Sequence, residues 1–132
     1  MPKEYVEIYT ALPYHAGMTT NFVTLVEFPE FQKKAASLLS EEELLELKIF
    51  LASNPEAGDL IQGTGGVRKL RWASQGQGKR GGTRIIYYFQ DLRFPIFLLT
   101  LFAKNMKSDL TQAHRNELRN IIESIKQSRR KK

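Results

Sequence analysis

The residues best suited to chemistry in this sequence are cations gathered in one stretch. Between Asp59 and Asp91 there is no acidic residue, but there are six basic ones: Arg68, Lys69, Arg71, Lys79, Arg80 and Arg84. Clustered charge makes a strong local field, so a polyanion such as RNA is the expected partner. The alternative interpretation is a solvated basic face with a basic tail, residues 128–132, in a protein of formal net charge +6.

Other chemistries have less support. The 132 residues include no cysteine, which excludes a thiolate zinc site and a cysteine nucleophile and fits a reducing, cytoplasmic setting. Of the two histidines, His15 stands near the amino terminus, and we expect His114 to be structural or on the surface. The successive acids 41–43 cannot converge on one ion. We therefore predict no metal and no cofactor.

Nucleotide and membrane binding are also disfavoured. The pair Gly78-Lys79 resembles a phosphate-binding loop, but that motif needs a glycine where Ala73 stands and a serine or threonine where Arg80 stands. No apolar run approaches the roughly 20 residues that span a bilayer. We expect a soluble protein without a membrane partner.

The hydrophobic pattern predicts one α+β domain over residues 18–127. Its expected order is strand, helix, helix, three strands, helix, at 22–26, 29–39, 41–53, 67–73, 83–90, 95–103 and 111–127. We expect an antiparallel sheet with its helices packed on one face. Residues 1–17 show no clear period and are interpreted as an extension, with Met18 as a candidate initiator.

Alternation along residues 67–73 separates the side chains of this predicted strand into two sets. Leu70 and Trp72 share one face with Arg68, and Lys69 and Arg71 share the other. If the apolar pair is buried, Lys69 and Arg71 are presented together.

A second predicted strand adds a third cation and aromatic rings. Arg84 has the same register as Ile86 and Tyr88, and an exposed ring of Tyr87 or Tyr88 would stack on an unpaired base. The tyrosines and Phe89 cannot all face outward, so at least one belongs to the core. The remaining candidate RNA contacts are Arg68, Lys79, Arg80, Lys104, Asn105 and Lys107.

Three blocks of sequence point to a family. They are GGVRKLRW at 65–72, GKRGGTRIIYY at 78–88, and LTLFAKN with SDLT at 99–111. Together they resemble the HigB toxins of the RelE superfamily over roughly residues 20–127. The resemblance implies a RelE-like fold and an endoribonuclease that cuts messenger RNA in the decoding site of the 30S ribosomal subunit. It also implies a HigA-like antitoxin with a helix-turn-helix domain. The toxin would then contact DNA only indirectly, through this antitoxin.

The resemblance assigns roles to particular positions. Lys69 and Arg71 match the basic pair on the second strand of RelE-type toxins, and Arg84 matches the arginine that opens the next strand. Asn105 stands where some relatives have a catalytic arginine, and Thr111 where some have a functional tyrosine, so the chain departs from the family pattern at these two positions.

A metal-independent cut is possible when the RNA 2′-hydroxyl attacks the neighbouring phosphate, which requires a base, charge stabilisation and an acid. Crowding by other cations favours Lys69 as the base, while Arg71 and Arg84 hold the phosphate. Lys79 or Arg80 is either the acid or a contact to ribosomal RNA. Two alternatives stay open: an RNA- or ribosome-binding module that does not cleave, and a scaffold that binds a protein partner through its apolar helix faces.

Overall fold

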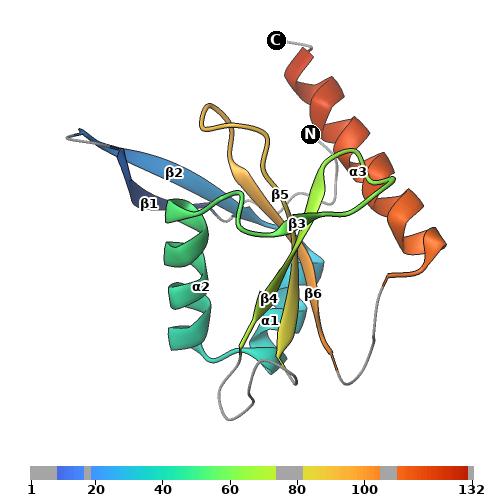
Figure 1. Ribbon diagram of the computed structural model, residues 1–132, viewed down its shortest axis with the longest axis horizontal. Coiled ribbons are helices and arrows are strands. Elements are labelled where there is room, and N and C mark those ends of the chain that lie inside the picture. Colours follow the sequence, from blue (N-terminus) through green and yellow to red (C-terminus); the bar gives the residue numbers. More distant parts are fainter. Residues whose placement is uncertain (1–8, 17–18, 74–81, 105–109, 131–132) are drawn as a thin grey trace.

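The computed structural model describes residues 9–16, 19–73, 82–104 and 110–130, which form a twisted sheet and three helices (Figure 1). The strands are β1 (Tyr9–Ala16), β2 (Thr19–Glu27), β3 (Asp59–Leu60), β4 (Val67–Trp72), β5 (Thr83–Tyr88) and β6 (Ile96–Ala103). The helices are α1 (Pro29–Leu38), α2 (Glu41–Ser53) and α3 (Gln112–Arg130). In the sheet the strands follow the order β1-β2-β6-β5-β4-β3.

The α+β class and the order of the seven predicted elements are confirmed, but the sheet is mixed rather than antiparallel. β2 lies parallel to β6, with Leu25 opposite Ile96, while the other neighbours are antiparallel. The chain leaves β2 through two helices and returns at the far edge of the sheet. A crossover of this kind can join parallel strands, which a tight hairpin cannot.

The sheet begins earlier than the sequence pattern indicates. β1 pairs with β2 from Tyr9 opposite Val26 to Ala16 opposite Thr19, so residues 9–16 belong to the sheet although we predict an extension there. Pro13 discourages a strand assignment because proline donates no ladder hydrogen bond. β1 is an edge strand, where a proline is tolerated. Where translation starts stays a prediction.

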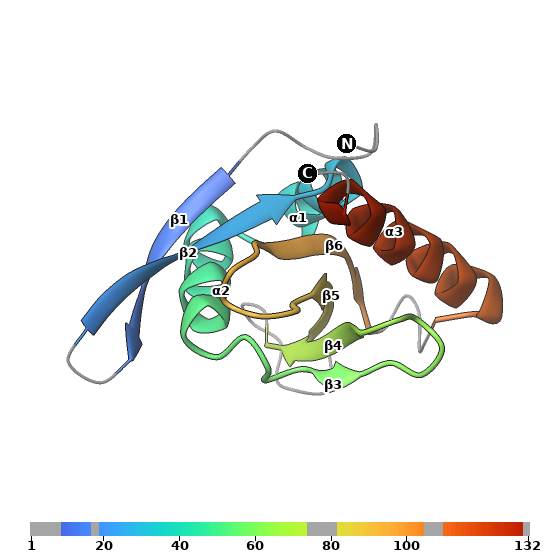
Figure 2. The same cartoon turned by 90° about the horizontal axis from the view of Figure 1, so that it is seen from above.

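Helices cover both faces of the sheet, which corrects the expectation of one covered face. One core cluster joins Phe31 of α1 and Leu51 of α2 to Leu70 and Ile85, and a second joins Ile122 of α3 to the opposite face. α2 and α3 accordingly stand on opposite sides of the central strands (Figure 2). All six residues of β5 are buried, as expected for a strand covered on both sides.

The helix starts follow local hydrogen bonding. The amide of Glu43 donates to the hydroxyl of Ser40 (3.0 Å) and the amide of Ser40 donates to the Glu43 carboxylate (2.8 Å), which confirms the predicted capping box. At α3, the amide of His114 donates to the hydroxyl of Thr111 (3.2 Å), so Thr111 caps that helix as expected. No helix in the described part of the chain is long and apolar enough to cross a membrane.

Candidate functional site

The pairing of β4 with β5 brings three predicted cations onto one face of the sheet. Arg71 lies directly opposite Arg84, and Lys69 lies opposite Ile86, one pleat further along. Val67 and Ile86, which share this face, pack in the core cluster of α3. Lys69, Arg71 and Arg84 therefore project from the α3 side of the sheet, at the end where β5 begins. We call these three residues the cationic site.

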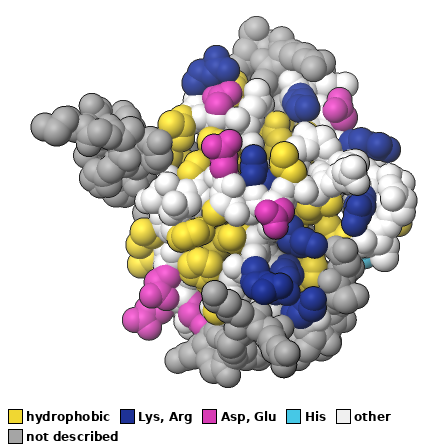
Figure 3. Space-filling model, in the orientation of Figure 1, with side chains coloured by type: hydrophobic (Ala, Val, Ile, Leu, Met, Phe, Trp, Pro, Cys, Tyr) yellow, Lys and Arg dark blue, Asp and Glu magenta, His cyan; other side chains and the backbone are white. Residues whose placement is uncertain are grey.

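The three side chains of the cationic site differ in their exposure to solvent. Arg71 is exposed and Lys69 is half-buried, whereas Arg84 is only 6% exposed. In Figure 3, Lys and Arg side chains gather over the lower part of the central strands, and hydrophobic and acidic side chains lie over α2.

Arg84 is in an environment that disfavours its charge. Burial, and secondly the positive charge of Arg71, lower the pKa of the Arg84 guanidinium. Its Nη1 is buried and has no hydrogen-bond partner within the described residues. Two like charges directly opposite each other on neighbouring strands are also destabilising. Such a costly arrangement of buried and like-charged groups is uncommon in native proteins.

Lys104 lies at the same end of the sheet as the arginine pair. Its amide donates to the carbonyl of Gly82 (3.1 Å), next to Thr83, which opposes Ala103. The Lys104 side chain is exposed, as its predicted role requires. Four other predicted contacts lie outside the described residues: Lys79, Arg80, Asn105 and Lys107.

Arg68 does not belong to the cationic site. It projects from the opposite face, where its Nη1 donates to the carbonyls of Gly58 (2.7 Å) and Glu56 (3.1 Å) and its Nη2 lies 3.8 Å from the Glu56 carboxylate. These contacts hold the loop after α2 and give Arg68 a structural role, while RNA binding by Arg68 stays a prediction. The alternation of β4 already separates Arg68 from Lys69 and Arg71.

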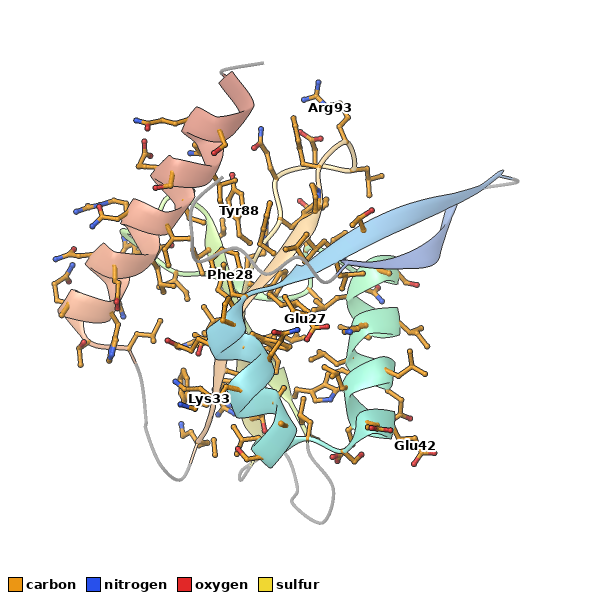
Figure 4. All side chains as sticks on the ribbon, turned by 180° about the vertical axis from the view of Figure 1, so that it is seen from behind. Glu27, Phe28, Lys33, Glu42, Tyr88 and Arg93 are labelled. Atoms are coloured by element: carbon orange, nitrogen blue, oxygen red, sulfur yellow. The ribbon has the colours of Figure 1, made fainter. Side chains whose placement is uncertain are left out.

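The predicted stacking tyrosine is also buried. Tyr88 is 3% exposed, and its ring packs 6.4 Å from the ring of Phe97. In Figure 4, Tyr88 and Phe28 lie between α3 and the strands. Tyr87 is fully buried on the other face. Neither ring is exposed for stacking on a base, because helices cover both sides of β5.

Tyr87 provides a testable link between β5 and the loop after α2. Its hydroxyl donates to the carbonyl of Pro55 (2.9 Å) and accepts from the amide of Gly58 (2.9 Å). A Tyr87→Phe variant leaves the buried amide of Gly58 and the partly buried carbonyl of Pro55 without this partner, so we expect it to lose about 1–3 kcal/mol of unfolding free energy in urea titrations. Equal stability of the two proteins would contradict this role.

The burial of Tyr87 also makes the stability of the protein depend on pH. Burial raises the pKa of Tyr87 above its usual value of 10.0. The unfolded chain therefore releases the Tyr87 proton at lower pH than the folded protein, and stability falls as pH rises above about 10. We expect the wild type to lose stability between pH 9 and 11 more steeply than Tyr87→Phe, as measured by urea titrations at each pH.

No group of three metal-ligating side chains (His, Cys, Asp or Glu) occurs in the described ranges. The fold and the site together define a small α+β protein with a cationic surface on its sheet. The family model described as the RelE toxin of the RelE/RelB toxin-antitoxin system matches residues 30–132. The chain thus belongs to the RelE toxin family, and membership of a toxin-antitoxin system implies an antitoxin as partner.

Proposed function

We propose that this protein is an endoribonuclease toxin that cuts messenger RNA on the ribosome and thereby stops translation and growth. The observation that carries the proposal is the arginine pair, in which the buried guanidinium of Arg84 lies opposite Arg71 with an unpartnered nitrogen among the described residues. Such a pair can bind a phosphodiester and stabilise the extra negative charge of its transition state. Membership of the RelE toxin family supports the same activity.

In the proposed reaction, the ribose 2′-oxygen forms a bond to the adjacent phosphorus while the bond from phosphorus to the 5′-oxygen breaks. The products are a 2′,3′-cyclic phosphate and a 5′-hydroxyl end, with no metal required. Arg71 and Arg84 stabilise the phosphate oxygens, and Lys69 is the proposed base for the 2′-hydroxyl proton. Lys79 or Arg80 is the proposed source of the proton for the leaving oxygen, or else a contact to ribosomal RNA.

The other proposed contacts of the protein are based on side-chain exposure and on the family resemblance. Lys104 lies exposed beside the arginine pair, and we propose it as an RNA contact together with Asn105 and Lys107. We further propose that the messenger is bound in the decoding site of the 30S subunit. The proposed antitoxin is HigA-like, and its helix-turn-helix domain supplies the contact with DNA. The proposed place of action is the cytoplasm.

Transcript ends mapped in cells after brief induction test this proposal. We expect new, defined ends within coding regions, and we expect them to carry a 5′-hydroxyl, so that they are captured by ligation only after treatment with a kinase. Ends with a 5′-phosphate would contradict attack by the 2′-hydroxyl. Arrested translation without new ends would show instead a module that inhibits by occupying the ribosome.

A further inference from the structure

Four buried side-chain atoms have no hydrogen-bond partner within the described part of the protein: Arg68 Nε, Trp72 Nε1, Arg84 Nη1 and Thr100 Oγ1. Arg68 and Trp72 project from the face that α1 and α2 cover. Arg84 and Thr100 project from the α3 face, which carries the cationic site. Nearly all buried polar groups in native proteins are hydrogen-bonded, so two unpartnered ones on the same functional face require an explanation.

Strand register places Thr100 and Arg84 close together. Arg84 lies opposite Phe102, and Thr100 lies two residues from Phe102 and opposite Ile86. Arg84 and Thr100 are therefore diagonal neighbours on one face of an antiparallel pair. Such neighbours are about 7–8 Å apart, within reach of a long side chain such as arginine.

The sequence around Thr100 also sets it apart. It is the single polar residue of β6, whose sequence is IFLLTLFA. The predictions from sequence omit it, although an isolated hydroxyl within an otherwise apolar strand is a visible signal. A valine would fill the same volume without leaving a buried hydroxyl unsatisfied. A threonine here costs stability unless its hydroxyl has a ligand.

We propose that Thr100 is a substrate-positioning residue whose hydroxyl donates to a non-bridging oxygen of the same phosphodiester that Arg84 binds. This inference rests on the proposed function of the cationic site. A phosphodiester offers two non-bridging oxygens, each with several lone pairs, so it can accept from both donors at once. Both atoms are covered in the free protein, and neighbouring side chains must rearrange when the phosphate enters.

The test compares Thr100→Val, which removes the hydroxyl at nearly constant volume, with Thr100→Ser, which keeps it. The matched control is Thr83→Val, because Thr83 lies opposite Trp72 and projects from the other face. Three quantities are measured at fixed salt: the unfolding midpoint, the affinity for single-stranded RNA bearing 2′-O-methyl groups, and the kcat/KM for cleavage of ribosome-bound messenger.

We expect Thr100→Val to be as stable as the wild type or more stable, and yet to bind the uncleavable RNA and cleave the messenger at least tenfold more weakly. Thr100→Ser and Thr83→Val should retain affinity and cleavage within about twofold. A more stable protein with weaker binding is not explained by a merely structural role. If Thr100→Val folds poorly, Thr100→Ala is compared with Thr100→Ser, because these two variants lack the same methyl group and differ in the hydroxyl.

Failure of this inference differs from failure of the proposed function. Unchanged RNA affinity and cleavage in Thr100→Val would show that the Thr100 hydroxyl is only buried or only bound to water. The inference would then be wrong, and the proposed nuclease activity would be unaffected. Suppose instead that the wild type binds RNA, that Thr100→Val loses this affinity, and that the wild type cuts no messenger. This result would overturn the nuclease proposal and leave the inference intact.

Discussion

An Arg84→Met variant is expected to fold normally and to lose toxicity. Methionine fills much of the buried volume of the arginine stem but cannot bind a phosphate. Loss of one preorganised donor to a transition state costs about 10²–10³ in rate, and here a full charge is lost as well. We therefore expect cleavage of ribosome-bound messenger to fall at least 100-fold, and induced cells to keep growing.

Stability should move in the opposite direction. Burial and the charge of Arg71 both lower the pKa of Arg84, which means that the folded protein disfavours the charged guanidinium. Removing it relieves the like-charge opposition and the unsatisfied nitrogen, so the unfolding midpoint should equal or exceed that of the wild type. Binding sites commonly trade stability for function in this way.

Arg93→Met is the matched control for this experiment. Arg93 is exposed, and its guanidinium donates to the carboxylate of Asp91 in the turn before β6 (3.0 and 3.1 Å). It should remain fully toxic. Full toxicity of a folded Arg84→Met protein would remove the proposed active centre, and loss of toxicity in Arg93→Met would indicate a general dependence on charge.

The parts of the fold that sequence predicts well are governed by local interactions. The start of α2 depends on Ser40 and Glu43, three residues apart, and the two faces of β4 follow from simple alternation. The parallel pairing of β2 with β6 depends on the course of the whole chain. The run around Ile85 and Ile86 reads equally well as a strand buried on one face or on two, so nothing local reveals that α3 covers the second face.

Only the part of the cationic site that lies on one strand could be predicted from the sequence. Alternation brings Lys69 and Arg71 together, but the opposition of Arg71 and Arg84 depends on the register between β4 and β5. A shift of one residue would turn Arg84 to the other face. The buried state of Tyr88 likewise depends on α3, which is remote in sequence. Thr100 could not be selected as a site residue from the sequence, because only the register between β5 and β6 places it diagonally from Arg84.

A Glu27→Gln variant is expected to lose much of the stability of the protein. Glu27 ends β2, and its carboxylate accepts a hydrogen bond from the ammonium of Lys48 on α2 (2.5 Å). The two side chains are only 7% and 11% exposed, and Glu27 lies between the strands and helices in Figure 4. Removing one partner of a buried ion pair weakens the compensation of the other charge and typically costs about 3–5 kcal/mol.

Two further variants separate the cost of burying the Lys48 charge without Glu27 from the stabilisation that the ion pair provides. Glu27→Leu combined with Lys48→Met should recover most of the loss, because apolar residues of similar volume replace buried ion pairs at little cost. Glu30→Gln breaks the exposed pair between Glu30 and Lys34 on α1 (3.3 Å) and should cost less than about 0.5 kcal/mol.

Thermal unfolding monitored by circular dichroism measures these differences, and we expect the midpoint of Glu27→Gln to fall by roughly 10–20 °C. A fall as small as that of Glu30→Gln would mean that water reaches Lys48 in solution and screens its charge. A double variant no more stable than Glu27→Gln would show that the attraction between Glu27 and Lys48 itself holds α2 against β2. Either result would contradict the expected effect of the Glu27–Lys48 pair on the packing of α2 against the sheet that carries Arg84.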